Sequence, residues 1–328
     1  MIQKAHIADE KIIKKISSDY NIQTKLFEFL PVGEASWCYK VTDHSNKQWF
    51  IKLTTSDLYK PSVLIPYFLQ HQQHNSFIFS AEKNISGELI DTIENFCLAL
   101  YPYIEGKEAR YSEMTPLQWT TIGSYMYNLH TTQLPSNLFD QLQKETFTSR
   151  WGENVEQILE ESQNPQTNSI PQNLAKFIEI KREEIHHILH RTQELGQQII
   201  EKNPQLVLCH GDIHTANIFL TPENTMYIID WDNVQIAPIE RDIMFFTSDI
   251  YENFMKGYNP KNDLVVDPLI IAYYKYEWVV QEFADYGQRV FFHDLNTVSK
   301  QHALDEFYKL FNPDDVIDGA YSTEESIQ

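Results

Sequence analysis

The chain has 328 residues, 42% of them hydrophobic and 13% aromatic, which is enough apolar material for a large core in two lobes or domains. Its formal net charge of −20, from 46 acidic and 26 basic residues, argues against nucleic-acid binding, which needs lysine and arginine to replace phosphate counterions. Three scattered cysteines exclude a disulfide framework, and no run approaches the roughly 20 apolar residues of a membrane helix. We expect a soluble, cytoplasmic protein, monomeric or weakly dimeric, that binds neither membranes nor nucleic acid.

The first hundred residues are expected to be rich in β-structure after one short helix at about Asp9–Tyr20. A further helix is expected at Ser62–His74, where apolar residues recur at helical spacing, and Pro66 is tolerable there only in the first turn. Runs of aromatic and β-branched residues predict strands at Thr24–Pro31, Trp37–Thr42, Gln48–Leu53, Glu88–Asp91 and Phe96–Tyr103.

Beyond Glu105-Gly106 the pattern becomes helical. Thr115-Pro116-Leu117-Gln118 has the residues of a helix cap, with a helix to about Thr131. Asn173–Asn203 reads as one long charged helix or a pair, and the last hundred residues are largely helical. We therefore predict an α+β chain with a small β-rich lobe (1–100), a hinge (101–106) and a larger helical lobe (107–328).

One polar motif stands between predicted strands of the second lobe. The apolar run Leu206–Cys209 ends on His210-Gly211-Asp212, and Asn217 follows five residues after the acid. A turn at Thr221–Asn224 and a returning strand that ends on Asp230 complete a hairpin. The pattern predicts that the hairpin ends at Asn217 and Asp230 lie side by side, with Asp212 on the approaching loop.

This layout suits phosphoryl transfer. One carboxylate must accept the proton of the attacking hydroxyl, and a second carboxylate with an amide oxygen must hold Mg²⁺ on the nucleotide phosphates. Asp212 fits the first role, and Asn217 with Asp230 fits the second. Lys52, a lone cation in an apolar strand, is expected on the phosphates. The alternatives are an ordinary hairpin with polar turn residues, and a lysine that protects a sheet edge.

These residues resemble the aminoglycoside phosphotransferase and choline kinase superfamily, through Cys209–Asn217, Ile228–Asp232 and Ala237–Asp242. The resemblance implies the bilobal protein-kinase-like fold, ATP or GTP as phosphate donor, Mg²⁺, and a small hydroxylated acceptor. It implies that backbone at Leu100, Tyr101 and Tyr103 reads the nucleobase. In the nucleotide loop Pro31–Trp37 our candidates for phosphate contact are Gly33 and Ser36.

Within the superfamily the chain most resembles the spectinomycin phosphotransferases, which implies a cationic aminocyclitol antibiotic as acceptor and resistance as the outcome. This closer resemblance also rests on Phe50–Leu53, Tyr101-Pro102, Tyr273-Tyr274, Tyr286–Gln288 and Phe311–Pro313. Two other functions stay open: a metabolic kinase for a choline-, homoserine- or methylthioribose-like acceptor, and a nucleotide-binding pseudokinase or regulator.

One departure concerns Lys52. Kinases of this shape usually pair the strand lysine with a glutamate on the next helix, but Ser56–Gln73 contains no glutamate and Asp57 is its only acid. We expect Lys52 to pair with Asp57, with a more distant acid such as Glu82, or with phosphate alone.

The acceptor pocket is predicted from helical spacing. Tyr274, Glu277, Gln281 and Asp285 form one stripe on a probable helix at Pro268–Phe292. We expect this stripe either to bind the ammonium groups of the acceptor or to face solvent. Trp231 and Asp232, directly after the metal acid, are expected either to line the site or to pack and cap locally.

Overall fold

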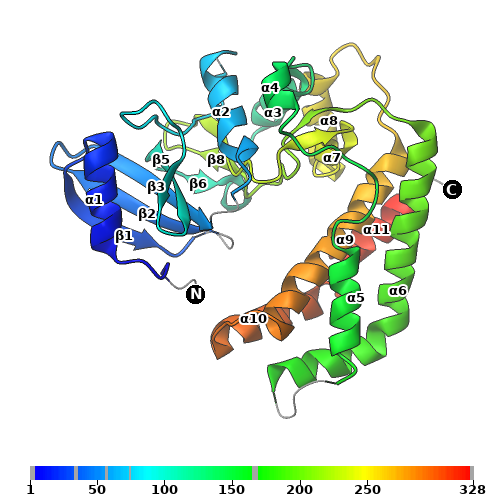
Figure 1. Ribbon diagram of the computed structural model, residues 1–328. Coiled ribbons are helices and arrows are strands. Elements are labelled where there is room, and N and C mark those ends of the chain that lie inside the picture. Colours follow the sequence, from blue (N-terminus) through cyan, green and yellow to red (C-terminus); the bar gives the residue numbers. More distant parts are fainter. Residues whose placement is uncertain (1–3, 33–35, 56–57, 74, 165–168, 326–328) are drawn as a thin grey trace. The chain divides into compact units, whose positions relative to one another are not determined.

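The computed structural model describes residues 4–32, 36–55, 58–73, 75–164 and 169–325. The chain forms two compact units, each assembled from several segments (Figure 1). The first contains Met1–Gln143, His210–Gln235 and Ser248–Pro260, and the second contains Lys144–Cys209, Ile236–Thr247 and Lys261–Gln328. The expected hinge at 101–106 lies inside the first unit, so the lobe boundary at that point stays a prediction.

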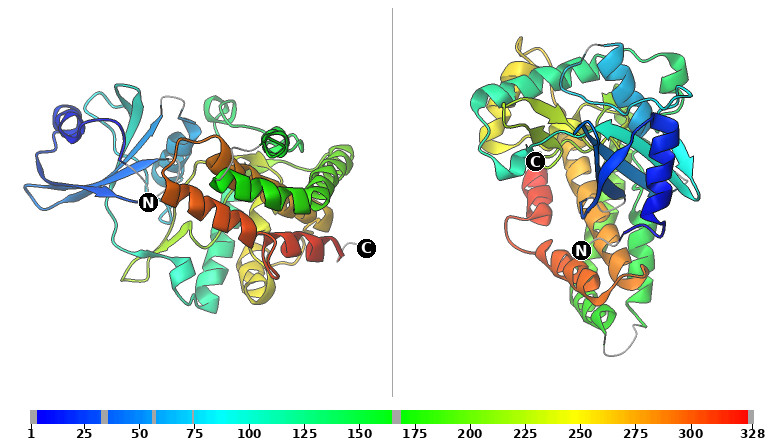
Figure 2. Two further views of the ribbon diagram at one scale, coloured as in Figure 1. Left: turned by 90° about the horizontal axis from the view of Figure 1, so that it is seen from below. Right: turned by 90° about the vertical axis from the view of Figure 1, so that its left-hand side faces the viewer.

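The first unit begins with an amphipathic helix on an antiparallel sheet. In α1 (Asp9–Tyr20), Ile12 and Ile16 are fully buried against the sheet, and Figure 2 shows the helix lying across one of its faces. The order of the five strands is β1-β2-β3-β5-β4, and each neighbouring pair is antiparallel. The strands span Thr24–Leu30 (β1), Trp37–Asp43 (β2), Gln48–Thr55 (β3), Asp91–Ile93 (β4) and Phe96–Pro102 (β5).

Two local predictions for this unit are wrong. α2 runs from Pro61 to His71, so Pro66 is its sixth residue and lies inside the helix. The helix tolerates this loss of a backbone donor because Pro66 and its apolar neighbours are buried. The strand expected at Glu88–Asp91 starts only at Asp91. The preceding residues form a turn instead, in which the Asn84 side chain accepts the Glu88 amide at 2.9 Å and Gly87 has a φ of 85°.

The predicted hairpin is present. β8 (Ile218–Leu220) and β9 (Met226–Ile228) pair antiparallel, with Ile218 opposite Ile228. The turn between them contains Asn224 with a φ of 62°, a conformation that asparagine adopts more readily than most residues. A short strand that the sequence did not reveal, β6 (Lys107–Glu108), pairs with the outer side of β8.

Two helices of the first unit touch through glycine. α3 (Pro116–His130) starts with the predicted capping box of Thr115 and Gln118, and it packs against α8 (Ser248–Tyr258). A Cβ on Gly123 would lie 2.0 Å from the Phe254 carbonyl oxygen, and one on Gly257 would lie 1.8 Å from the Thr120 carbonyl oxygen. The two backbones therefore approach as closely as glycine alone allows. Two short elements complete the unit: a 3₁₀ turn, η1 (Ala109–Tyr111), and α4 (Ser136–Phe139).

The second unit is built around one helix, α9 (Pro268–Phe291), which several other helices of the unit contact (Figure 1). A large apolar core joins these helices. Residues 170–202 form a single helix, which settles the choice between one helix and two. None of the helices in the described ranges combines the length and apolar character required to cross a membrane. The other elements are α5 (Gly152–Glu161), α6 (Ile170–Lys202), β7 (Val207–Cys209), β10 (Gln235–Ala237), α7 (Glu240–Ile243), α10 (Thr297–Lys309) and α11 (Val316–Glu325).

The contact between α3 and α8 predicts a stability effect. We expect Gly123→Ala to lower the free energy of unfolding by about 1–3 kcal/mol, because the added methyl group must push two backbones apart. Gly319→Ala is the control: Gly319 lies in α11 with nothing near its missing Cβ, so alanine should be neutral or stabilise by up to about 1 kcal/mol. Denaturant unfolding of both variants tests this, and equal midpoints would contradict it.

Candidate active site

The hairpin brings the two expected metal ligands together. Asn217 directly precedes β8 and Asp230 follows β9 by two residues, and the Ile229 amide donates to the Asn217 carbonyl oxygen at 3.0 Å. This bond fixes the two strand ends side by side, as the sequence predicted.

A tight turn places Asp212 beside the hairpin. Gly211 has a φ of 85°, and a Cβ there would lie 2.1 Å from the carbonyl oxygen of Asn233. Both facts require glycine, because an L side chain would meet strain and a backbone clash at once. The buried His210 imidazole contacts the Ile229 carbonyl oxygen at 3.0 Å, which ties the turn to the hairpin.

Asp212 is surrounded by amide groups. The Asn217 side-chain NH₂ donates to the Asp212 carbonyl oxygen at 2.8 Å and lies 3.4 Å from its Oδ2. The Asn233 side-chain NH₂ lies 3.5 Å from the same Oδ2, and His214 Nε2 lies 3.6 Å from it. Sequence reasoning did not single out Asn233 or His214. The position of His214 two residues after Asp212, inside the motif, was the available signal.

The oxygens left at the hairpin suit a hard divalent cation. Because the Asn217 NH₂ faces Asp212, its Oδ1 points the other way. The Asp230 side chain is 51% exposed and stands on a backbone with a φ of 61°, an uncommon conformation for a residue other than glycine. One amide oxygen and one carboxylate, with room for phosphate oxygens, form a donor set that fits Mg²⁺.

Lys52 reaches this hairpin from β3. Its Nζ lies 2.7 and 2.9 Å from the two carboxylate oxygens of Asp232 and 3.3 Å from Oδ1 of Asp230. The expected partners were different: Asp57 lies outside the described residues, and Glu82 has no contact with the lysine among the interactions of the described chain. Of the expected alternatives, the structure has a more distant acid, but it is not Glu82: the hairpin itself supplies Asp232 and Asp230.

The three charges shift one another's protonation. Burial disfavours the Lys52 ammonium, but the charges of Asp230 and Asp232 outweigh this and raise its pKa. Burial also opposes ionisation of Asp230, yet Lys52 prevails and the pKa of Asp230 is lowered. The pKa of Asp232 is raised by burial and by its neighbour Asp230, against the opposing effect of Lys52. Lys52 is thus a permanent cation at neutral pH.

Several of the expected nucleotide-binding residues lie in or next to β2 and β5. Ser36 is buried just before β2, and Gly33 falls outside the described residues. The Leu100 carbonyl oxygen accepts the Glu82 amide at 2.7 Å, and the Tyr103 amide donates to the Gln48 carbonyl oxygen at 3.1 Å. Those two backbone groups are therefore engaged. Burial raises the pKa of Tyr101 to about 12, and the Lys52 charge partly opposes this.

The residues after Asp230 face in different directions. The Trp231 ring is only 4% exposed and packs edge-on against His210, with ring centroids 4.6 Å apart. Its indole N–H donates to the Ile228 carbonyl oxygen at 3.3 Å. Trp231 thus packs against the turn at His210-Gly211, whereas Asp232 binds Lys52.

The predicted acceptor stripe on α9 does not have one common environment. Tyr274 and Glu277 are buried in the second unit, where the Tyr274 hydroxyl donates to Glu145 at 3.1 Å and Glu277 accepts the Arg150 amide at 2.9 Å. Asp285 is more exposed and forms an ion pair with Arg289 at 2.9 Å. The expectation that the stripe as a whole faces solvent is therefore wrong. Its part in acceptor binding stays a prediction.

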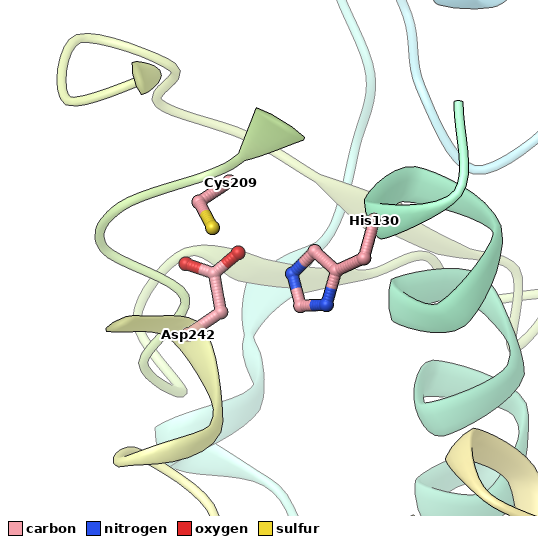
Figure 3. A group of neighbouring side chains, drawn as sticks. All are labelled: His130, Cys209 and Asp242. Atoms are coloured by element: carbon pink, nitrogen blue, oxygen red, sulfur yellow. The ribbon is translucent and has the colours of Figure 1, made fainter. Parts of the chain in front are cut away.

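A buried thiol lies at the end of β7. Cys209 is fully buried and donates to the carbonyl oxygens of Ala237 and Pro238 at 3.5 and 3.4 Å. Figure 3 shows its sulfur facing the Asp242 carboxylate, and burial together with that charge raises the pKa of the thiol well above its ordinary value. His130, also drawn there, ends α3 in the first unit and contacts the Tyr258 hydroxyl at 2.7 Å. Cys209 is therefore a structural, protonated thiol.

The fold and the site define a class: a kinase-like enzyme with a small antiparallel sheet, a larger helical part, and a catalytic hairpin that carries acids and an amide. Residues 39–274 match the phosphotransferase enzyme family, and the chain belongs to that family. Its members transfer phosphate to hydroxyl groups of small molecules, the enzyme class predicted from the motif. No curated protein sequence matched the chain significantly.

Solved structures support this assignment. The chain is similar to a spectinomycin phosphotransferase crystallised with ADP and spectinomycin, with 26% identity, a TM-score of 0.84, and coverage of 98% of this chain and 100% of that one. Choline kinase LicA from Streptococcus pneumoniae shares 17% identity at a TM-score of 0.61, with 96% and 99% coverage. An amicoumacin kinase crystallised with AMP-PNP and Ca²⁺ shares 14% identity at 0.62, with 94% and 95% coverage. The last two share the fold alone.

Glu277 predicts a pH dependence of stability. Burial raises its pKa to about 7 from 4.5, so the unfolded chain loses this proton first as pH rises. The contribution of Glu277 to the free energy of unfolding is therefore complete below pH 4.5 and is lost as pH rises through about 7. The shift in pKa corresponds to a loss of about 3 kcal/mol. Glu277→Gln should therefore gain stability relative to the native protein between pH 5 and pH 8. A difference in melting temperature that stays constant over this range would contradict the assignment.

Proposed function

We propose that the protein transfers the γ-phosphate of ATP or GTP to a hydroxyl of an aminocyclitol antibiotic of the spectinomycin type, and so confers resistance. The observation that carries the proposal is the meeting of Lys52 with Asp230 and Asp232 beside Asp212 and Asn217, within one unit. The acceptor class is supported by the 26% identity with spectinomycin phosphotransferase over nearly the whole chain.

In the proposed reaction Asp212 accepts the proton of the acceptor hydroxyl as that oxygen attacks the γ-phosphorus. The bond to the β,γ-bridging oxygen breaks, and the nucleoside diphosphate leaves. Asn217 Oδ1 and the Asp230 carboxylate would hold Mg²⁺, which supplies charge neutralisation for the phosphates. Lys52 adds a fixed positive charge at the same place. Gly33, Ser36 and the backbone at Leu100–Tyr103 are the proposed contacts for the rest of the nucleotide.

The acceptor is proposed to be cationic. A net charge of −20 gives the molecule a field that attracts ammonium groups. Among the candidate acceptor residues on α9, Asp285 carries the most exposed carboxylate, at 39%. Tyr274 and Glu277 lie in the core beneath, where they can contribute only by holding the shape of α9.

An acceptor screen tests the function. Spectinomycin, choline, homoserine and methylthioribose are each incubated with ATP or GTP, and phosphorylated products are detected by mass spectrometry. We expect phosphospectinomycin from the native protein. Asp212→Asn should lower kcat by about 10²-fold or more while nucleotide binding persists, because the proton acceptor is lost.

Each outcome of the screen separates two functions. Product from choline or another metabolite alone would indicate a metabolic kinase, and no product from any acceptor would favour a nucleotide-binding regulator. Nearly full kcat in Asp212→Asn would refute the assignment of the base.

Asp232 is proposed to replace the missing helix glutamate by holding Lys52. We expect Asp232→Asn to lower kcat with little change in the KM of spectinomycin, because the lysine loses its shortest contact. The same substitution in a Lys52→Ala background should have almost no further effect, because two residues that act through one contact are not additive. A raised KM for spectinomycin, together with losses in kcat that add in the double variant, would indicate instead that Asp232 lines the acceptor pocket.

A further inference from the structure

His214 occupies the loop between Asp212 and Asn217. Its Nδ1 accepts a hydrogen bond from the Ala216 amide at 3.2 Å. A ring nitrogen that accepts a hydrogen bond carries no proton, so a neutral His214 must carry its proton on Nε2. The backbone of the loop therefore selects one tautomer of this imidazole.

An acceptor for the Nε2–H group of His214 lies nearby: Oδ2 of Asp212, at 3.6 Å. The Asn217 NH₂ lies 3.5 Å from Nε2, but both groups are donors in this tautomer, and the amide already donates to the Asp212 carbonyl oxygen at 2.8 Å. The geometry directs the imidazole proton at the catalytic carboxylate.

Three donors thus converge on a single oxygen. Oδ2 of Asp212 faces His214 Nε2 at 3.6 Å, Asn233 Nδ2 at 3.5 Å and Asn217 Nδ2 at 3.4 Å. Within the described part of the chain, no side chain or amide donates to Oδ1 of Asp212. These distances are longer than a strong hydrogen bond, as is common in catalytic sites before the substrate binds.

We propose that His214 and Asn233 are positioning residues that hold Oδ2 of Asp212 and so reserve Oδ1 for the acceptor hydroxyl. A carboxylate can rotate about its terminal bond, and donors gathered on one oxygen oppose that rotation. Asn217 shares this task through its NH₂ while its Oδ1 faces the metal position. The proposal rests on the proposed function, because it assigns Asp212 as the base.

Two substitutions at residue 214 separate the roles of the two ring nitrogens. In His214→Asn the amide oxygen can replace Nδ1 and accept the Ala216 amide, but the shorter side chain at residue 214 no longer brings a donor to Asp212. In His214→Gln the amide nitrogen can replace Nε2 and donate to Oδ2. The first variant preserves the loop and removes the donor, and the second restores the donor.

Kinetics with ATP and spectinomycin give the first test. We expect His214→Asn to lower kcat by about 10- to 100-fold, the effect of one hydrogen bond to a charged group, with both KM values retained. His214→Gln should recover most of the loss, and Asn233→Ala should resemble His214→Asn. Equal losses in the asparagine and glutamine variants, or native kcat in both, would overturn the proposal.

Nuclear magnetic resonance gives a test that needs no acceptor. In protein labelled with ¹⁵N histidine, the His214 signals are assigned by their loss in His214→Gln. In the neutral form of the ring we expect the proton on Nε2. A neutral ring with its proton on Nδ1 would overturn the proposal even where spectinomycin is not phosphorylated, an outcome that alone would count against the proposed function.

Discussion

The contact of the Lys52 ammonium with Asp230 and Asp232 is the interaction on which the site depends. It joins the central strand of the sheet to the end of the catalytic hairpin, two segments 178 residues apart in sequence. Asp230 and Asp232 both contact this one ammonium, and burial together with the charge of Asp230 raises the pKa of Asp232. Their mutual repulsion is relieved by the lysine in the structure, and it would be relieved further by a metal ion on Asp230. The sheet and the hairpin are therefore coupled by charge as well as by packing.

Around Asp212, too, single groups serve more than one purpose. Asn217 uses its NH₂ on the Asp212 carbonyl oxygen, which directs its oxygen to the opposite side. Gly211 lets the chain turn so sharply that the Asn233 backbone occupies the place where a side chain at residue 211 would begin. A single loop and hairpin thus set the direction of Asp212, the proposed base, the direction of the Asn217 amide oxygen and the placement of Asp230, the proposed metal ligand.

Much of this could be predicted from the sequence because its signals are local. The hairpin follows from two apolar runs with a turn between them, and Lys52 stands out as one cation in an apolar strand. The partner of Lys52 could not be predicted, because it depends on how a strand and a distant hairpin pack. The expectation that Pro66 lies in the first turn of its helix was wrong, because burial of its apolar neighbours outweighs the loss of one backbone hydrogen bond. Helical spacing grouped Tyr274 with Asp285, but a helix of 24 residues passes through both core and surface.

The backbone contact between α3 and α8 has a consequence for motion. Contacts made by side chains can loosen when rotamers change on the picosecond to nanosecond scale, but Gly123 and Gly257 each face main-chain atoms of the other helix. Two helices joined in this way should move together as one rigid body. Thermal fluctuation in the first unit should then be concentrated in its loops, and amide hydrogens along the α3–α8 contact should be among its slowest to exchange with solvent.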